Sequence, residues 1–342
     1  MAESMSLSIK QCALLLSLSC VLACGGGDSG GPPSVPGPEP GPAASGGVLS
    51  LFGKPLTPPE LSEDRRAEFE TKLAEAQRVL DADPDDPDAL IWLGRRTAYL
   101  GRYREAIEIF GRGFEKFPDD HRFLRHRGHR FITIRDFPVA VEDLEQAAAL
   151  IENRPDAIEP DGLPNERNEP RSTSHSNIWY HLGLAYYLQG DFDNAARCYV
   201  ECMKFSKNAD MLTATTHWYY MTLRRLDRDA EAAALLEAID EEMDVIENPA
   251  YHQLLLMYKG LRSPSELHRA QTEGETPLDV ATLGYGIGNW YLYNHQPIQG
   301  EAILREVVTG EQWNAFGYIA AESELHRSGA RLAVVSGGDG RD

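Results

Sequence analysis

The feature that most constrains this chain is a spacing of 34 residues that two independent landmarks share. Gly94 lies 34 residues before Gly128, and Ala106 lies 34 residues before Ala140. Because a glycine and an alanine shift by the same amount, the period does not depend on one residue. A period of this length is typical of arrays in which each structural unit packs against its neighbours.

Both landmarks recur once more, at Gly183 and Ala195, which lie 55 residues further on. Since 55 − 34 = 21, we expect an insertion of 21 residues at about residues 153–175. The clear repeats are then residues 87–120, 121–152 and 176–209.

The residues at the recurring positions alternate in size as two antiparallel helices require. Small residues such as Gly94 and Ala106 let the helix backbones approach, and large ones such as Phe110 fill the space between repeats. Gly101 and Gly190 permit the tight turn between the helices, because glycine readily adopts a positive φ. The pattern predicts helix–turn–helix units.

Residues 179–186, WYHLGLAY, match the first-helix signature of the tetratricopeptide repeat position by position. The chain therefore resembles this family. The resemblance implies an all-α fold, a right-handed α-solenoid of about six helix pairs with a closing C-terminal helix. We expect the solenoid to cover residues 57–327, with degenerate repeats over 212–310 and a flexible tail over 328–342.

The folded part is expected to begin at Thr57-Pro58-Pro59-Glu60. Thr57 can cap a helix, Pro58 suits the first helical position, and Glu60 can complete a capping box. We expect this helix to run to about Leu80.

The first 23 residues are predicted to be a targeting segment. Lys10 precedes a mostly apolar run that ends in Val21-Leu22-Ala23-Cys24, as in a secretory signal. A cysteine at this place resembles a bacterial lipoprotein box, which implies cleavage before Cys24 and lipidation, for example with palmitate, of its sulfur. A plain signal peptide or a buried helix is the alternative. Bacterial lipoproteins with an acidic residue after the cysteine tend to stay at the inner membrane. Because Gly25 follows here, the resemblance implies anchoring at the periplasmic face of the outer membrane.

Residues 24–56 are expected to form a disordered tether after the lipidated cysteine. Residues 25–47 consist mainly of glycine and proline, with almost nothing that can be buried. Spacing the folded part from the membrane is the expected role.

The composition excludes several classes of protein. The chain has 53 acidic residues against 33 Lys and Arg, a net charge of −20, and 42% hydrophobic residues, which is typical of a folded acidic protein. A general nucleic-acid binder is excluded because phosphate contacts need a basic face. Five cysteines are too few for a disulfide framework.

No catalytic residue, metal site or cofactor site is predicted. His126 and His129 have i, i+3 spacing, but two imidazoles among arginines make a poor cation site. Cys198 and Cys202 lie four residues apart on one predicted helix, where core packing is expected rather than a disulfide.

Charge placement gives the one candidate binding surface. Residues 90–135 contain eleven Lys or Arg against five acids, and residues 121–130 contain no acid. In the repeat family the first helices line a concave groove through set positions, which implies groove residues Arg95, Arg122, Arg125, His126, His129, Asn177, Tyr180 and His181. Guanidinium groups bind carboxylates through two hydrogen bonds.

The sequence therefore predicts a lipid-anchored protein-interaction module that binds an acidic peptide segment or a C-terminal carboxylate. Two alternatives remain at this point. One is an enzyme whose site is assembled across repeats. The other is a structural element whose groove is filled by the chain's own acidic insertion, which carries Glu159 and Asp161.

Overall fold

The computed structural model describes residues 47–272 and 277–329. The predicted signal peptide, Cys24, most of the tether and most of the tail lie outside the described residues. The described part is built from these helices in chain order: α1 (Glu63–Ala82), α2 (Pro87–Tyr99), α3 (Tyr103–Lys116), α4 (His121–Thr133), α5 (Phe137–Leu150), α6 (Ser174–Gln189), α7 (Phe192–Met203), α8 (Ala209–Arg225), α9 (Asp229–Leu235) with the 3₁₀ turn Leu236–Ala238, α10 (Pro249–Tyr258), α11 (Pro264–Thr272), α12 (Pro277–Tyr293), α13 (Pro297–Val307) and α14 (Phe316–Arg327).

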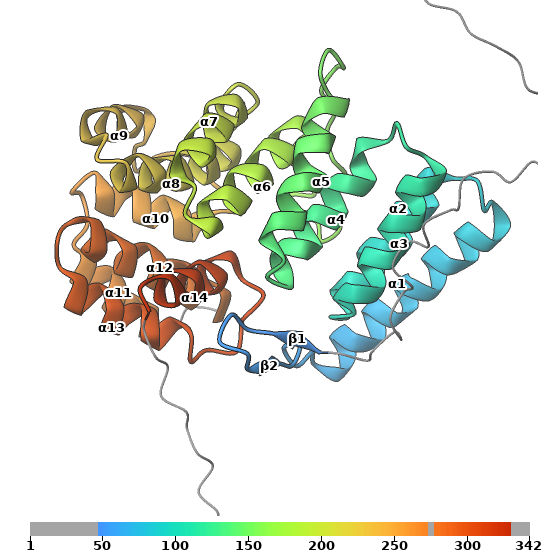
Figure 1. Ribbon diagram of the computed structural model, residues 1–342, viewed down its shortest axis with the longest axis horizontal. Helices are drawn as coiled ribbons and strands as arrows, with labels where there is room; N and C mark the ends of the chain where they lie inside the picture. Colours follow the sequence, from blue (N-terminus) through green and yellow to red (C-terminus); the bar gives the residue numbers. More distant parts are fainter. Residues whose placement is uncertain (1–46, 273–276, 330–342) are drawn as a thin grey trace, which may run out of the picture. The chain divides into compact units, whose positions relative to one another are not determined.

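The predicted all-α solenoid is confirmed. Successive helices pack as antiparallel pairs, α2 with α3, α4 with α5, α6 with α7 and α8 with α9, and later α12 with α13 (Figure 1). Between these pairs, α10 packs against α8 and α12, and α11 packs against α12. Helix α14 closes the array against α12 and α13. The second helix of the fourth pair is short, since α9 ends at Leu235 and, after the 3₁₀ turn, the buried Ile239 follows in extended backbone.

Helix boundaries follow from local capping. Asp86 and Asp120 each accept a hydrogen bond from the backbone N–H two residues on, which begins α2 and α4. Gly101 and Gly190 have φ of +76° and +84° and form the turns that the sequence predicts. In the corresponding turn after α4, Arg135 adopts φ +70° although it is not a glycine.

A glycine in the first helix of each clear repeat contacts a large side chain of the second helix. A Cβ atom added at Gly94 would lie 2.4 Å from the ring of Phe110, and one added at Gly128 would lie 2.7 Å from Leu144. Because both neighbours are fully buried, neither can move aside. The glycines therefore set the distance between the paired helices.

The start of the folded part differs from the prediction. Val48–Leu49 (β1) and Pro55–Leu56 (β2) form an antiparallel hairpin within the segment predicted as tether, and α1 begins after Ser62 rather than at Thr57. Burial explains the difference, because the side chains of Val48 and Leu56 lie in the core.

The C-terminal helix α14 is tied to distant parts of the chain by a buried ion pair. Arg135 Nη2 lies 2.8 Å from Glu322 Oε2, and the two side chains are 3% and 1% exposed. The other oxygen of Glu322 accepts a hydrogen bond of 2.7 Å from Leu51 N, in the β1–β2 turn, while Arg135 also donates to the carbonyl of Trp313. The turn after α4, the hairpin and α14 thus meet at one carboxylate.

We predict that Arg135→Ala lowers the free energy of unfolding by about 3–5 kcal/mol, because it leaves Glu322 charged, buried and unpaired. The double variant Arg135→Met/Glu322→Gln removes both charges and keeps an acceptor for Leu51 N. Its free energy of unfolding should therefore fall less than that of Arg135→Ala. Urea unfolding followed by circular dichroism compares the two, and equal losses would contradict this account.

Candidate functional site

The first helices of the pairs form the inner layer of the array. Helix α4 contacts α2 and α6, and α6 contacts α8, in addition to their partners within each pair. The predicted groove residues all lie on α2, α4 and α6. The predicted binding site therefore corresponds to the inner layer formed by these three helices.

A pocket of about 140 Å³ opens between α2 and α4. We call it the basic pocket. Its lining comprises Arg95, Ala98, Tyr99, Phe110, Arg125, His126, His129, Arg130 and Glu159. Four of the eight predicted groove residues are thus brought together in one cavity: Arg95, Arg125, His126 and His129.

The basic pocket contains three guanidinium groups and one carboxylate. Arg125 Nη2 pairs with Glu159 Oε1 at 3.0 Å, both side chains being almost buried, and Arg125 Nε is buried without a hydrogen-bond partner. Arg95 and Arg130 form no ion pair with any acid of the described residues. Burial lowers the pKa of Arg130 to about 10, which still leaves it protonated at neutral pH.

The histidines add donors and acceptors to the basic pocket but no charge. Burial, and then the neighbouring guanidinium groups, hold the pKa values of His126 and His129 well below the ordinary value. The pKa of His181, whose ring lies 4.5 Å from that of His129, is lowered for the same reasons. The positive charge of the site therefore comes from arginine alone.

The other predicted groove residues lie outside the basic pocket. Arg122 pairs with Asp88 and Asp120 at 2.5 and 2.6 Å, and the bonds to Asp120 raise its pKa. The amide of Asn177 donates to Glu159 at 3.0 Å, which links it to the pocket through that carboxylate.

Tyr180 and His181 face the C-terminal half of the described chain. Tyr180 Oη lies 3.4 Å from Tyr251 Oη, and the ring of His181 lies 5.7 Å from that of Phe316. These contacts place both residues beside a second cavity, of about 270 Å³, whose lining includes His129, Tyr251 and Phe316. His129 lines both cavities.

Sequence reasoning missed the three other polar residues of the basic pocket: Tyr99, Arg130 and Glu159. Arg130 belongs to the acid-free run that the sequence analysis singled out, one helical turn after His126, so its position was a usable signal. Glu159 was recognised only as one of several acids of the insertion. Its contact with Arg125 depends on how the insertion folds, and the insertion lies outside the repeat pattern from which the other positions were predicted.

The insertion covers the inner layer. Residues 154–173, here called the strap, are held at one end by α2, where Arg95 Nη1 donates to the carbonyl of Pro160 at 2.8 Å and Arg96 Nη1 donates to that of Gly162 at 2.9 Å. Both guanidinium groups also lie over the Trp92 ring, at 4.4 and 4.7 Å.

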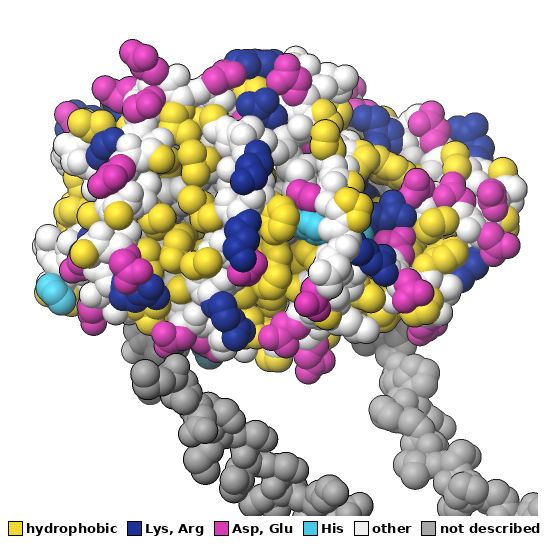
Figure 2. All heavy atoms as spheres, turned by 90° about the horizontal axis from the view of Figure 1, so that it is seen from above, with side chains coloured by type: hydrophobic (Ala, Val, Ile, Leu, Met, Phe, Trp, Pro, Cys, Tyr) yellow, Lys and Arg dark blue, Asp and Glu magenta, His cyan; other side chains and the backbone are white. Residues whose placement is uncertain are grey.

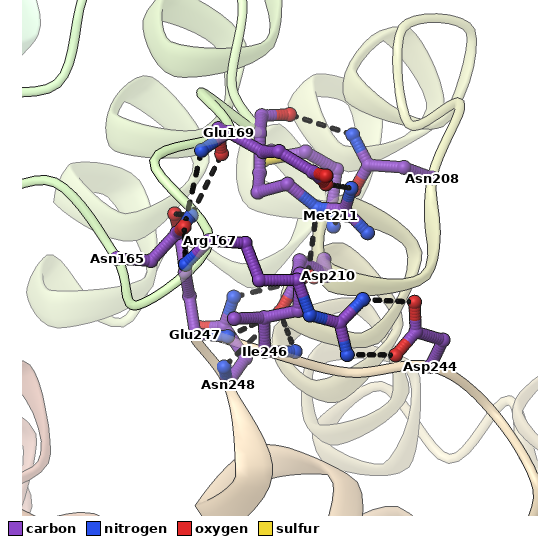
Figure 3. Close-up of polar contacts among 11 residues, drawn as sticks. Asn165, Arg167, Glu169, Asn208, Asp210, Met211, Asp244, Ile246, Glu247 and Asn248 are labelled. Atoms are coloured by element: carbon purple, nitrogen blue, oxygen red, sulfur yellow. Dashed lines mark hydrogen bonds and ion pairs between the residues drawn. The ribbon is translucent and has the colours of Figure 1, made fainter.

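The other end of the strap is held by the loop before α10. Arg167 forms two hydrogen bonds, of 2.7 and 2.6 Å, to the carboxylate of Asp244, and Asn165 donates to Glu247 at 2.6 Å (Figure 3). All of these groups are exposed. The strap therefore spans the inner layer from α2 to the loop at residues 244–248.

Asp210 is the buried anchor of this arrangement. Its fully buried carboxylate accepts hydrogen bonds of 3.0, 2.7 and 3.2 Å from the backbone N–H groups of Ile246, Glu247 and Asn248, and it pairs with Arg171 Nε at 3.0 Å (Figure 3). Three backbone donors and one guanidinium compensate the desolvation of this carboxylate. The base of the strap and the loop before α10 are thereby joined.

A larger hollow of about 670 Å³ lies elsewhere, between α5, α6 and α7, with Trp179, Leu182 and Phe205 in its lining. None of the predicted groove residues lines it. On the face shown in Figure 2, hydrophobic side chains are visible between basic and acidic ones, and neither sign of charge covers the face uniformly.

Within residues 47–272 and 277–329, no group of three His, Cys, Asp or Glu side chains is arranged to hold a metal ion. Cys198 and Cys202 are both buried and free, and burial raises the pKa of each thiol to about 12. Such thiols are poor nucleophiles, which agrees with the core-packing role expected from the sequence.

Comparison with known proteins supports the repeat architecture. Family models of the tetratricopeptide repeat match residues 93–158 and 176–209. Human tetratricopeptide repeat protein 13 is 32% identical over 94 residues, which are 28% of this chain and 11% of that protein. The chain thus spans about a tenth of the length of this curated relative.

Similar solved structures include a tetratricopeptide repeat protein from Parabacteroides merdae, with 16% identity, coverage of 77% of this chain and 93% of that chain, and a TM-score of 0.45. Another is YrrB, described as a TPR protein with an unusual peptide-binding site, with 13% identity, coverage of 74% and 97%, and a TM-score of 0.39. The family matches and the helix pairs together identify tetratricopeptide repeats over residues 93–158 and 176–209.

The buried histidines predict a stability that falls in mild acid. Below pH about 6.5 the unfolded chain protonates these histidines, while His126, His181 and His217 stay neutral in the fold, so unfolding takes up protons. Each such histidine lowers the free energy of unfolding by up to about 2 kcal/mol between pH about 6.5 and 5.

His217 is the suitable test residue, because burial lowers its pKa to about 3 and it lies outside the basic pocket, stacked on Tyr251 at 4.4 Å. We expect His217→Phe to flatten the pH dependence in urea unfolding by the contribution of one proton. An unchanged slope would show that this histidine does not titrate differently in the two states.

Proposed function

We propose that this protein is a non-enzymatic protein-interaction module that binds an acidic peptide segment, or a chain's C-terminal carboxylate, in the basic pocket. Proteins built from tetratricopeptide repeats generally bind protein or peptide partners. The observation that carries the proposal is the charge imbalance in the pocket, where Arg95, Arg125 and Arg130 face the single carboxylate of Glu159.

The chemistry of the pocket favours a carboxylate. Arg125 Nε is a buried donor without a partner, and an unsatisfied buried donor lowers stability until a ligand supplies an acceptor. Guanidinium groups accept carboxylates in a planar, two-bond geometry. The neutral rings of His126 and His129 can add hydrogen bonds without attracting further anions.

The residues gathered here support binding rather than catalysis. The lining of the pocket contains no serine, threonine or cysteine that could act as a nucleophile, and its histidines are neutral at physiological pH. An enzyme with a site assembled across repeats is therefore the weaker of the two proposals.

We further propose that the protein is a lipoprotein of the bacterial envelope, anchored through Cys24 to the periplasmic face of the outer membrane. The supporting feature is the sequence Val21-Leu22-Ala23-Cys24 after an apolar run, followed by Gly25. Among the described residues, no helix has the length and hydrophobicity needed to cross a bilayer.

Binding is predicted to depend on the arginines of the basic pocket. Arg95→Gln and Arg125→Gln should each weaken the binding of a fluorescent glutamate-rich peptide at least about tenfold, since each removes a charged donor worth about 1.5–3 kcal/mol. Fluorescence anisotropy gives the affinity. The matched control is Arg78→Gln, an exposed arginine of α1, which should bind normally. Equal affinity in all four proteins would refute the pocket as the site.

The anchor has its own test. Labelled palmitate should be incorporated into the wild-type protein and lost on Cys24→Ser, because this cysteine is the proposed acceptor. Cys20→Ser, four residues earlier, serves as the control and should keep the label. Labelling of Cys24→Ser would exclude this anchor.

A further inference from the structure

We propose that the strap is a built-in ligand, and that residues 159–162 occupy the place where an extended acidic segment of a partner binds after displacing them. This inference rests on the proposed function and specifies the chemistry of the partner. Two observations support the inference. Glu159 lies in the basic pocket and pairs with Arg125, and two arginines of α2 donate hydrogen bonds to the backbone that follows Glu159.

The contacts of this segment are those of a bound peptide. One side chain, Glu159, pairs with Arg125 at 3.0 Å. The next two contacts use only backbone carbonyls, those of Pro160 and Gly162, which accept hydrogen bonds from Arg95 and Arg96. Because every peptide has backbone carbonyls, a partner needs one correctly placed carboxylate to reproduce all three contacts.

One position restricts the partner's sequence. A Cβ atom added at Gly162 would lie 1.7 Å from Tyr99 Oη and 2.8 Å from Arg95 Nη2. A segment bound in the same way must therefore place glycine three residues after its acidic residue. The expected recognition sequence is Glu-x-x-Gly, which residues 159–162, Glu-Pro-Asp-Gly, satisfy.

The strap satisfies the site only in part. Its carboxylate leaves Arg125 Nε without a partner, and neither Arg95 nor Arg130 has an ion pair among the described residues. Asp161, the other acid of this segment, has a buried oxygen without a hydrogen bond. A partner segment that brings a second, better placed carboxylate can therefore bind more favourably than the strap does.

The far end of the strap is held by groups that separate readily. The side chains of Arg167 and Asp244 are 48% and 63% exposed, and exposed ion pairs contribute only about 0–1 kcal/mol. By contrast, Arg171 at the base pairs with the fully buried Asp210. Release of the segment from residue 159 to residue 167 can therefore leave the base of the strap in place.

The test uses the full chain and a fluorescent synthetic peptide with the sequence of residues 155–166, which carries the Glu-x-x-Gly motif. Arg167→Asp repels Asp244 and should raise the affinity for the peptide at least about fivefold, which corresponds to about 1 kcal/mol. The charge exchange Arg167→Asp/Asp244→Arg restores the pair and should return the affinity to the wild-type value.

Two further variants make the result specific. Glu159→Gln weakens the hold of the strap on Arg125 and should also raise the affinity for the peptide. Arg228→Asp breaks an exposed pair with Glu231 away from the strap and should change nothing. In the peptide, replacing the glutamate by glutamine or the glycine by valine should abolish binding.

The possible results separate the two proposals. If the peptide binds wild type, Arg167→Asp and Glu159→Gln equally, the built-in ligand is refuted while carboxylate binding stands. If glutamate-rich peptides bind but the valine peptide binds as well as the glycine peptide, the motif is refuted. If no acidic peptide binds any variant, both the proposed function and this inference fail.

Discussion

The geometry of the array depends on close contact between a glycine of one helix and a large side chain of its partner. At Gly94 and Gly128 even a methyl group would overlap Phe110 or Leu144. This contact brings the paired helices together and leaves the first helices side by side as an inner layer. The basic pocket exists because α2 and α4 are held in this way, with arginines at positions that face the space between them.

Gathering three guanidinium groups in one cavity is unfavourable unless acceptors compensate the lost hydration and the repulsion between like charges. The strap supplies two of them: the Glu159 carboxylate for Arg125 and the carbonyl of Pro160 for Arg95. Arg130 instead lies over the ring of Tyr103, at 5.7 Å. An acidic chain thus contains a basic site against which part of its own acidic insertion packs.

The sequence predicted the parts of this structure that repeat. The helix pairs and their turns follow from a period, and Arg95, Arg125, His126 and His129 meet because the same helix faces recur in each repeat. Features that do not repeat were not predicted. The hairpin before α1 depends on burial against the rest of the fold, and the place of Arg122 depends on Asp88, an ion pair between two repeats. The course of the strap depends on Asp210 and Asp244, more than 35 residues away from it along the chain.

The hydrogen bond from Leu51 N to Glu322 joins residues 271 positions apart in the chain. Repeat arrays usually assemble through contacts between neighbouring units, so that the first units can fold while later ones are still being synthesised. Here Arg135 meets its buried carboxylate only after residue 322 has left the ribosome. The first repeats of this protein therefore reach their final stability last, and a nonsense mutation before codon 322 would weaken the beginning of the fold as well as its end.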